Sequence, residues 1–223
     1  MNNRYKKALK KIKKAKKILL VTHAKPDGDA ISSICAMMHI LDTLGKDYLA
    51  YCKDPAPEQL LFLPKTEQIV NNKESFKFAD FDLIISLDCG QIARTNLLDE
   101  IINRNGHQKF IEIDHHEKIE NLADIEIRIS GTSSTAEVVY NFIKANKIKI
   151  NKKIANCILT GILTDTSNFL YPSTTDKTIQ IASEMLLYGA KYPQITEETY
   201  RNKSFGAMKL WGKAISNNDI NKN

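Results

Sequence analysis

The chain has 223 residues, 43% of them hydrophobic, which is enough for one large domain with a real core and excludes a largely disordered protein. Its net charge of +6 comes from 32 Lys and Arg against 26 Asp and Glu, a mild excess that suits anionic ligands but identifies none. Apolar runs fall short of the roughly 20 residues of a membrane span and the roughly 7 to 15 of a secretion signal. We therefore expect a cytoplasmic protein with no membrane partner.

The first predicted element is a basic amphipathic helix. Residues 4–17, "RYKKALKKIKKAKK", carry nine basic side chains and no acid. Leu9 and Ile12 fall on one side of such a helix and are expected to face the core, which leaves the lysines in solvent. A basic run of this kind can also attract phosphate or a membrane surface, and that alternative stays open.

An alternation of apolar runs and helical patterns follows, and it predicts an α/β fold. Residues 29–45 and 95–106 have helical spacing, and each segment ends on a glycine. Right-handed crossovers between buried strands then give a mainly parallel sheet flanked by helices. The apolar runs expected to form the strands are "KILLVT", "DYLAYC", "FDLIISLD" and "KFIEID".

The second half of the chain is expected to be mostly helical. Residues 191–216 are predicted to form a linker helix region in which Trp211 packs, and residues 217–223 a disordered tail with little to bury. Three earlier segments have helical period, and each is opened by a polar capping residue. These segments are "SSTAEVVYNFIKAN", "KKIANCILTGILT" and "TDKTIQIASEMLLYGA".

Polar side chains stand at the carboxyl ends of three predicted strands, where open α/β sheets bind their ligands. Another carboxylate interrupts an apolar segment, "GILTDTSNF", that would otherwise be core. We expect these side chains to share one pocket. They are His23, Asp27 and Asp29 after the first strand, Asp88 after the third, Asp114, His115 and His116 at the end of the fourth, and Asp165 in the apolar segment.

Four carboxylates in one pocket would repel one another and destabilise the fold unless cations balance their charge. Two divalent ions supply four positive charges against Asp27, Asp29, Asp88 and Asp165. Oxygen ligands mixed with neutral imidazole suit manganese, and the absence of thiolates argues against a structural zinc site. Two ions roughly 3.5 to 4 Å apart are the arrangement that hydrolyses phosphate esters.

Each motif taken alone fits a plainer structural role. "PDGD" favours a turn, "DHH" could be an exposed strand end, and Asp88 or Asp165 could cap a helix. A calcium-binding EF-hand loop is excluded because Ile31 and further apolar residues follow, where that loop needs oxygen ligands. The joint occurrence of the motifs, in order along the chain, favours a metal site.

Some remaining residues are given structural roles. Ser133 or Ser134 is predicted to cap a helix with Glu137 near the capping-box position, although contact with a substrate phosphate stays open. His39 and His107 lie outside the motifs, and a helix face or a surface position is favoured for both. Four cysteines without a CxxC pair are predicted to be reduced core residues. They are Cys35, Cys52, Cys89 and Cys157.

Four segments together resemble the signature motifs of the DHH phosphoesterase family: "HAKPDGD", "SLDCG", "IDHHE" and "LTDTSNF". The segment "GTSSTAEVVY" is similar to the branch that degrades very short RNA and removes phosphate from 3'-phosphoadenosine 5'-phosphate. The resemblance runs from about Ile18 to about Trp211. It implies a DHH catalytic domain over residues 1–190 and a two-metal phosphoesterase.

The resemblance also implies a role for each motif residue. Asp114 would orient an imidazole, and His116 would face the substrate as a catalytic residue. Two divalent cations, Mn²⁺ by preference, would share Asp88 as a bridging ligand. The implied ligands are His23, Asp27 and Asp88 for the first ion, and Asp29, Asp88, His115 and Asp165 for the second.

The chain departs from the family mainly in that no segment resembles the glycine-rich motif of the smaller DHHA1 domain that follows in such relatives; Lys25 in the first motif and Ser32 are smaller departures, and neither is an implied ligand. We expect that domain to be absent, or supplied as a separate partner, and a homodimer is also considered. The leading hypothesis is hydrolysis of short oligoribonucleotides, nucleotide 3'-phosphates such as 3'-phosphoadenosine 5'-phosphate, or both. The alternatives are a noncatalytic, metal-stabilised nucleotide- or RNA-binding remnant, a half-enzyme that needs a separate substrate-binding domain, an exonuclease, and an inorganic pyrophosphatase of related architecture.

Overall fold

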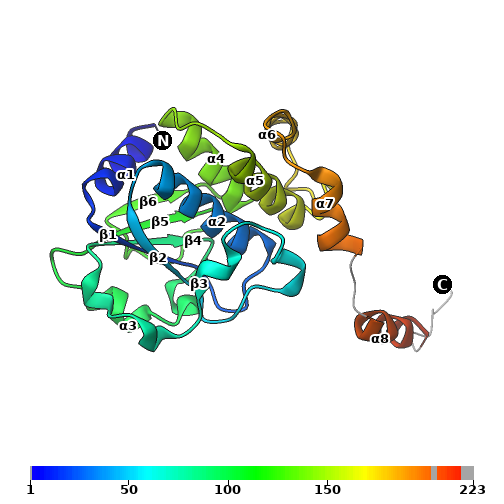
Figure 1. Cartoon of the computed structure of the whole chain (residues 1–223), viewed down its shortest axis with the longest axis horizontal. Helices are drawn as coiled ribbons and strands as arrows, with labels where there is room; N and C mark the ends of the chain where they lie inside the picture. Colours follow the sequence, from blue (N-terminus) through cyan, green and yellow to red (C-terminus); the bar gives the residue numbers. More distant parts are fainter. Residues whose placement is uncertain (1, 202–204, 217–223) are drawn as a thin grey trace.

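A six-stranded sheet forms the centre of the structure, a computed structural model that describes residues 2–201 and 205–216 (Figure 1). The strands are β1 Lys17–Val21, β2 Asp47–Tyr51, β3 Ile69–Val70, β4 Leu83–Leu87, β5 Lys109–Asp114 and β6 Ile125–Arg128. Their order is β3-β2-β1-β4-β5-β6, and every neighbouring pair is parallel. The predicted α/β class with a mainly parallel sheet is confirmed.

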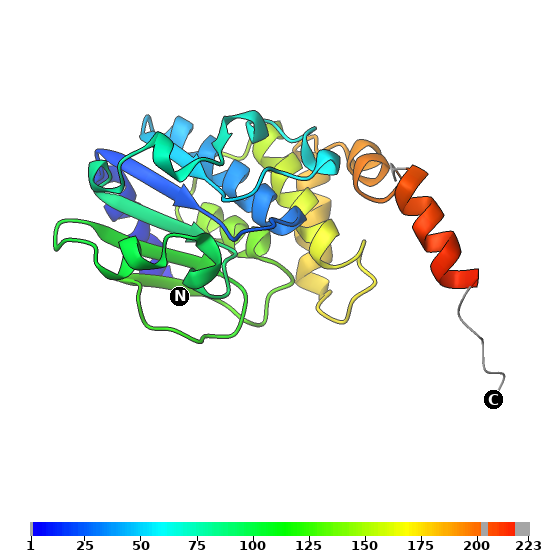
Figure 2. The same ribbon diagram turned by 90° about the horizontal axis from the view of Figure 1, so that it is seen from below.

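Helices flank the sheet and dominate the second half of the chain, as predicted. They are α1 Asn2–Lys14, α2 Gly28–Thr43, α3 Leu98–Ile102, α4 Thr135–Ala145, α5 Lys152–Asp165, α6 Asp176–Leu187, α7 Tyr192–Thr196 and α8 Phe205–Ser216. α1, α2, α4 and α5 pack with one face of the sheet around the larger hydrophobic core, and α3 closes a smaller core on the opposite face. α2 lies between the sheet and α5, so that its first turn is held at the edge of the sheet (Figures 1 and 2).

Strand β1 contributes to both cores because successive side chains of a strand point to opposite faces. Ile18 and Leu20 pack in the larger core, and Leu19 and Val21 in the smaller one. All four are fully buried. This burial on two sides explains why the strand is a continuous apolar run rather than an alternating one.

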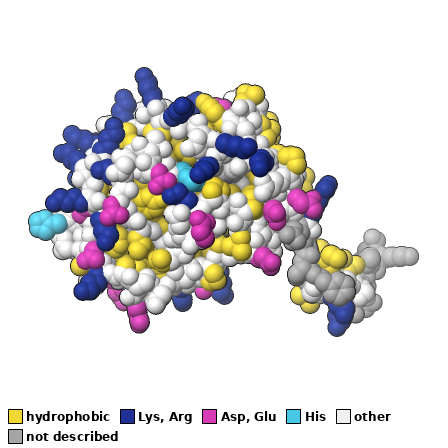
Figure 3. All heavy atoms as spheres, in the orientation of Figure 1, with side chains coloured by type: hydrophobic (Ala, Val, Ile, Leu, Met, Phe, Trp, Pro, Cys, Tyr) yellow, Lys and Arg dark blue, Asp and Glu magenta, His cyan; other side chains and the backbone are white. Residues whose placement is uncertain are grey.

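Helix α1 is the predicted basic amphipathic helix. Tyr5, Ala8 and Ile12 are buried, whereas Leu9, expected on the inner face, is only partly buried against the core. The lysines of the helix are exposed, and Figure 3 shows basic side chains gathered over this end of the molecule. The ring of Tyr5 meets that of Phe142 on α4 edge to face, which ties the helix to the larger core.

Three local features differ from the sequence-based expectation. Strands β3 and β6 were not predicted, because β3 has two residues and β6, "IEIR", is an edge strand whose charged residues interrupt the apolar pattern. The helix expected over 95–106 is reduced to the five residues of α3. Asn96 takes a left-handed conformation, with φ of 64°, and breaks the segment.

Helix α8 stands apart from the body in both views (Figures 1 and 2). Trp211 on this helix is 71% exposed, so its predicted packing is wrong. Residues 217–223, predicted to form a disordered tail, lie outside the described residues. Within the part of the chain that is described, no helix has both the length and the apolar character needed to cross a membrane.

The structural roles predicted for the four cysteines and for His39 and His107 are confirmed. All four cysteines are buried and free of disulfides. His39 is buried on α2, and His107 is exposed before β5.

Candidate metal centre

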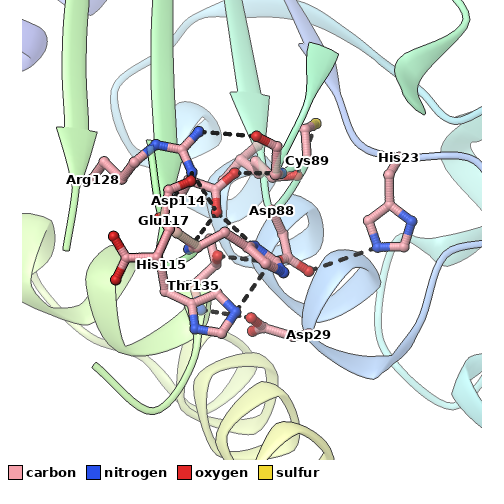
Figure 4. A network of polar contacts seen from close by, with 12 residues as sticks. His23, Asp29, Asp88, Cys89, Asp114, His115, Glu117, Arg128 and Thr135 are labelled. Carbon is pink, nitrogen blue, oxygen red and sulfur yellow. Dashed lines mark hydrogen bonds and ion pairs between the residues drawn. The ribbon is translucent and has the colours of Figure 1, made fainter. Parts of the chain in front are cut away.

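The predicted site residues meet at the carboxyl edge of the sheet. Strands β1, β4 and β5 are neighbours in parallel register, with Val21 beside Ser86 and Ser86 beside Glu112. The segments that leave these three strands therefore start side by side. Figure 4 shows the side chains of His23 and Asp88 in this region, together with those from the end of β5.

His23 and Asp27 are held by the turn that leads from β1 into α2. Nδ1 of His23 lies 2.8 Å from the carbonyl oxygen of Ala24, which selects the tautomer of the neutral ring that has the proton on Nδ1 and the lone pair on Nε2. Asp27 is the N-cap of α2, and its Oδ1 accepts a hydrogen bond from the backbone N–H of Ala30 at 3.0 Å. Both side chains are thus oriented by local bonds that leave Nε2 of His23 and Oδ2 of Asp27 facing each other.

Asp88 adopts a left-handed backbone conformation, with φ of 58°, directly after β4. This conformation is unfavourable for a residue with a side chain and is typically retained where function requires it. The carboxylate is buried, with 2% of the residue exposed. Its Oδ1 accepts a hydrogen bond of 2.9 Å from the hydroxyl of Thr135 on α4. The strained turn and this bond fix Asp88 in the middle of the site.

Asp29 is held by the N-terminus of α4. Its two oxygens accept hydrogen bonds from the backbone N–H groups of Thr135, at 2.5 Å, and Ala136, at 2.9 Å. The hydroxyl of Ser33 donates a further bond of 3.3 Å. Unpaired N–H groups and the helix dipole both favour a negative charge at this position. Thr135 binds both Asp29 and Asp88 but is not predicted from the sequence, because both partners are distant from it along the chain.

The candidate ligand atoms form adjacent groups in which all atoms of a group lie within 4.8 Å of one another. Nε2 of His23 is 3.6 Å from Oδ2 of Asp27 and 3.8 Å from Oδ2 of Asp88. Nε2 of His115 is 3.5 Å from Oδ2 of Asp165 and 3.7 Å from Oδ1 of Asp88. The groups are His23 with Asp27 and Asp88, Asp29 with His115 and Asp165, and Asp88 with His115 and His116.

These separations fit ligands arranged around a cation. They are longer than hydrogen bonds, whereas ligands about 2.1 Å from one metal ion lie about 3.0 Å apart at an angle of about 90° and about 3.6 Å apart at about 120°. The donors are carboxylate oxygens and imidazole nitrogens, the set that suits divalent transition metals. The residues present therefore fit the metal ions that the sequence motifs imply.

The charge of the pocket also calls for cations. Burial raises the pKa of Asp29 well above its ordinary value, and the charge of Asp165 raises it further. Burial likewise raises the pKa of Asp88 well above the ordinary value, with added repulsion from Asp29 and Asp27. Among the described residues, no Lys or Arg forms an ion pair with any of these four carboxylates. Burial lowers the pKa of His115, which keeps its imidazole in the neutral form that binds metals.

Asp114 orients His116 from beneath the site. Its Oδ1 accepts hydrogen bonds from the backbone N–H of His116, at 2.9 Å, and from its Nδ1, at 2.8 Å. Its Oδ2 accepts a bond of 2.8 Å from the backbone N–H of Gly90. Asp114 is fully buried, whereas the side chain of His116 is 42% exposed and stands at the rim. The hydrogen bond from His116 to Asp114 raises the pKa of His116.

Asp165 ends α5 just before an unusual turn. Ser167, Asn168 and Phe169 have consecutive positive φ angles of 48°, 58° and 69°. The hydroxyl of Thr166 accepts a hydrogen bond from the N–H of Phe169, and the N–H of Asn168 donates to the carbonyl of Leu163. The chain therefore reverses immediately after Asp165 and leaves its carboxylate facing His115.

Ser133 and Ser134 are both fully buried. Ser134 is the N-cap of α4 and accepts a hydrogen bond from the N–H of Glu137 at 3.1 Å, while the hydroxyl of Ser133 donates to the Glu137 carboxylate at 2.8 Å. These hydrogen bonds are the predicted capping interactions, and they shape the turn that positions Thr135. Contact of either serine with substrate stays a prediction.

Gly161 on α5 permits the close approach of Asp29 to α4. A Cβ atom there would lie 2.5 Å from the Cβ of Ala136 and 2.7 Å from Oδ1 of Asp29. Although alanine is the better helix former by about 1 kcal/mol, Gly161→Ala is expected to lower the free energy of unfolding by about 1 to 3 kcal/mol. It should also weaken metal binding because Asp29 is displaced.

Urea unfolding and Mn²⁺ titration measure the two effects of Gly161→Ala. Gly106→Ala is the matched control, since nothing lies within 4 Å of its added methyl group. If both variants behave alike, the close approach at Gly161 has no part in holding Asp29.

Three known proteins are similar to this chain over most of its length. The bifunctional oligoribonuclease and PAP phosphatase NrnA of Thermus thermophilus is 32% identical over 200 residues, which cover 89% of this chain and 58% of that protein. The protein of the same name from Bacillus subtilis is 30% identical, with 92% and 64% covered. The crystal structure of an exopolyphosphatase-related protein from Bacteroides fragilis matches with a TM-score of 0.89 at 30% identity, and covers 97% of this chain and 66% of that one.

The chain thus spans less than two thirds of the length of each of these relatives. A family model, described as the N-terminal domain of the DHH family, matches residues 17–162. This range contains the first three motifs at the carboxyl edge of the sheet, and the resemblance inferred from the motifs is confirmed. The chain belongs to the DHH family.

Proposed function

We propose that this protein is a metal-dependent phosphoesterase that hydrolyses short oligoribonucleotides, nucleotide 3'-phosphates such as 3'-phosphoadenosine 5'-phosphate, or both. The observation that carries the proposal is the pair of donor groups that meet at Asp88, one built on His23 and the other on His115. The names of the Thermus and Bacillus relatives support the substrate class.

Two divalent ions, with Mn²⁺ as the preferred ion, complete the proposal. When bound, such ions would neutralise charge on the phosphoryl group and lower the pKa of a coordinated water. Asp88 would bridge them, since its two oxygens face different imidazoles. The proposed ligands are His23, Asp27 and Asp88 for one ion, and Asp29, Asp88, His115 and Asp165 for the other.

His116 is proposed to act on the substrate directly. Asp114 accepts a hydrogen bond from Nδ1–H, so Nε2 of His116 is the atom free to hold a phosphoryl oxygen or to move a proton to the leaving group. The raised pKa of His116 favours the protonated imidazolium, which is the form that donates to a developing negative charge. Its position at the rim supports this role, because a substrate can reach it without rearrangement of the core.

The domain division is part of the same proposal. Residues 1–190 would form the catalytic domain and residues 191–216 a linker region. The relatives are longer than this chain, and the proposed partner is a DHHA1-like domain that supplies contacts that orient the substrate. Orientation contributes a large share of rate acceleration, up to about 7 to 11 kcal/mol. We therefore expect this chain to turn over more slowly alone than with such a domain, and a homodimer is a further candidate assembly.

The test is direct: the purified chain is incubated with Mn²⁺ and either a diribonucleotide or 3'-phosphoadenosine 5'-phosphate, and release of mononucleotide or phosphate is measured. Metal-dependent turnover of either substrate supports the proposal. Metal-dependent binding without turnover would instead identify a noncatalytic binder. Turnover of pyrophosphate with neither nucleotide cleaved would identify a pyrophosphatase and overturn the proposed substrate class.

A further inference from the structure

Arg128 is a buried cation at the end of the edge strand β6, close to the metal centre but outside its donor groups (Figure 4). Its side chain is only 6% exposed. Nη2 lies 2.5 Å from Oε1 of Glu112, and Nη1 lies 3.5 Å from Oδ1 of Asp114. Both partners are buried carboxylates on β5, the strand that leads into His115 and His116. One guanidinium therefore balances two buried acids beneath the site, and its Nε also lies 3.5 Å from Oε1 of Glu126 on its own strand.

The same guanidinium also donates to three backbone carbonyls. Nη1 donates to the carbonyls of His116, at 2.9 Å, and Glu117, at 3.2 Å. Nη2 donates to the carbonyl of Gly90 at 3.3 Å. These carbonyls belong to two different turns, the one that follows β5 and the one that follows β4. Arg128 thus connects the turn of the site histidines to the turn that begins at Asp88.

Only arginine can make this set of contacts. A guanidinium is planar, is always charged and presents five donors in a fixed fork, whereas a lysine ammonium is a single charge centre on a flexible stem. A buried ion pair is weak evidence for stability because desolvation offsets most of the attraction. The arrangement is better explained by geometry, since it sets the distance between two turns that carry metal-centre residues.

We infer that Arg128 is a positioning residue that holds the His115–His116 turn against the Asp88–Gly90 turn, so that both turns present their side chains at metal-binding distance. It acts through Asp114 and through the backbone of the turns, and it touches none of the candidate ligand atoms. The inference rests on the proposed function in so far as a divalent ion must bind at these side chains.

The experiment compares Arg128→Lys with the matched control Arg104→Lys. Arg104 is also a partly buried arginine that donates to two backbone carbonyls, those of Ile101 and Leu122, and pairs with a carboxylate, that of Asp124. It lies at the amino end of β5, away from the metal centre. Mn²⁺ binding is measured by calorimetric titration, and melting temperature is measured in the presence of a chelator.

We expect Arg128→Lys to weaken Mn²⁺ binding by about 10- to 100-fold, the range found when groups that orient metal ligands are removed. Arg104→Lys should bind Mn²⁺ within about twofold of the wild-type protein. If Arg128→Lys lowers the melting temperature but binds Mn²⁺ as the wild-type protein does, Arg128 is only a structural residue and the inference is wrong.

Hydrogen exchange separates this inference from the proposed function. The backbone N–H of His116 donates to Asp114, and we expect it to exchange at least about tenfold faster in metal-free Arg128→Lys than in the wild-type protein. If the wild-type protein binds no Mn²⁺, the proposed function is overturned, and the exchange rate alone decides the role of Arg128. Faster exchange in Arg128→Lys supports the positioning of the turn, and an unchanged rate refutes it.

A second variant covers the case in which Arg128→Lys does not fold. Glu112→Gln keeps the shape of the side chain and the carbonyl contacts of Arg128 but removes its strongest charged partner. It should also weaken Mn²⁺ binding, by a smaller factor than Arg128→Lys does. Unchanged Mn²⁺ affinity in Glu112→Gln, together with an unchanged exchange rate at His116, would count against the inference.

Discussion

Asp88→Asn is expected to abolish metal-dependent hydrolysis while it makes the metal-free protein more stable. The amide is a poor replacement for the anionic ligand that two ions are proposed to share, so kcat/KM should fall at least about a thousandfold. The opposite effect on stability follows from the surroundings of the carboxylate. Burial, Asp29 and Asp27 all raise the pKa of Asp88, which means that its charge is unfavourable when no metal is bound.

Two further features mean that asparagine adds no cost in the metal-free protein. The amide oxygen can still accept the hydrogen bond from Thr135. Asparagine tolerates left-handed backbone conformations as aspartate does, and φ at this position is 58°. A gain of about 1 kcal/mol would raise the melting temperature by about 2 to 4 °C for a domain of this size.

Activity with Mn²⁺ and thermal melting with a chelator measure the two effects of Asp88→Asn on the same preparation. Asp80→Asn, at an exposed position in the turn before β4, is the control and should change neither quantity. Full activity in Asp88→Asn would show that Asp88 does not bridge the metals.

Removal of divalent metal is expected to lower the melting temperature markedly. An ion that binds only the folded state at a hundred times its Kd stabilises that state by about 2.7 kcal/mol. This corresponds to about 5 to 10 °C for one site in a chain of this length. Addition of EDTA should therefore shift the melting curve down by at least that amount, and excess Mn²⁺ should restore it.

The metal effect should grow as pH rises. The pKa values of Asp29, Asp88 and Asp165 are raised in the metal-free fold, mainly by burial. The folded state then holds protons that the unfolded state has released, so metal-free stability falls as pH rises from the ordinary carboxyl range through the raised pKa values. Bound cations replace these protons, so the melting curves with and without Mn²⁺ should diverge towards neutral pH.

A pH series of melting curves, with EDTA or with Mn²⁺, measures this divergence. Asp88→Asn is the control, because loss of the shared ligand should remove most of the response to Mn²⁺. Identical melting temperatures with and without Mn²⁺ at every pH would contradict metal binding at this site.

Sequence patterns predict the central strands well and the edges poorly. β1, β4 and β5 are continuous apolar runs because both faces of the sheet are covered, and short runs of this kind between turns are typical of buried parallel strands. The edge strand β6 has alternating charges. One of these charged residues, Arg128, contacts Glu112 and the neighbouring turns. A residue that serves a distant contact breaks the local pattern that would have identified its strand.

In the candidate site, too, some residues can be predicted from the sequence and others cannot. Residues that follow adjacent parallel strands were predicted to converge because topology alone brings those ends together. Thr135 was not predicted, since its bonds to Asp29 and Asp88 span 106 and 47 positions in the chain and leave no mark on the local sequence. The left-handed conformation of Asp88 also follows from the tertiary fold rather than from its neighbours in sequence.

The three left-handed residues that follow Asp165 have a consequence for engineering and for evolution. Glycine at Ser167 would relieve steric strain of about 1 to 2 kcal/mol, whereas Phe169 packs against the larger core and would lose that packing if it were replaced. Selection for heat tolerance alone would therefore favour glycine at position 167. The same substitution would loosen the backbone that holds the Asp165 carboxylate towards His115, so heat resistance and the proposed metal binding would compete at this position.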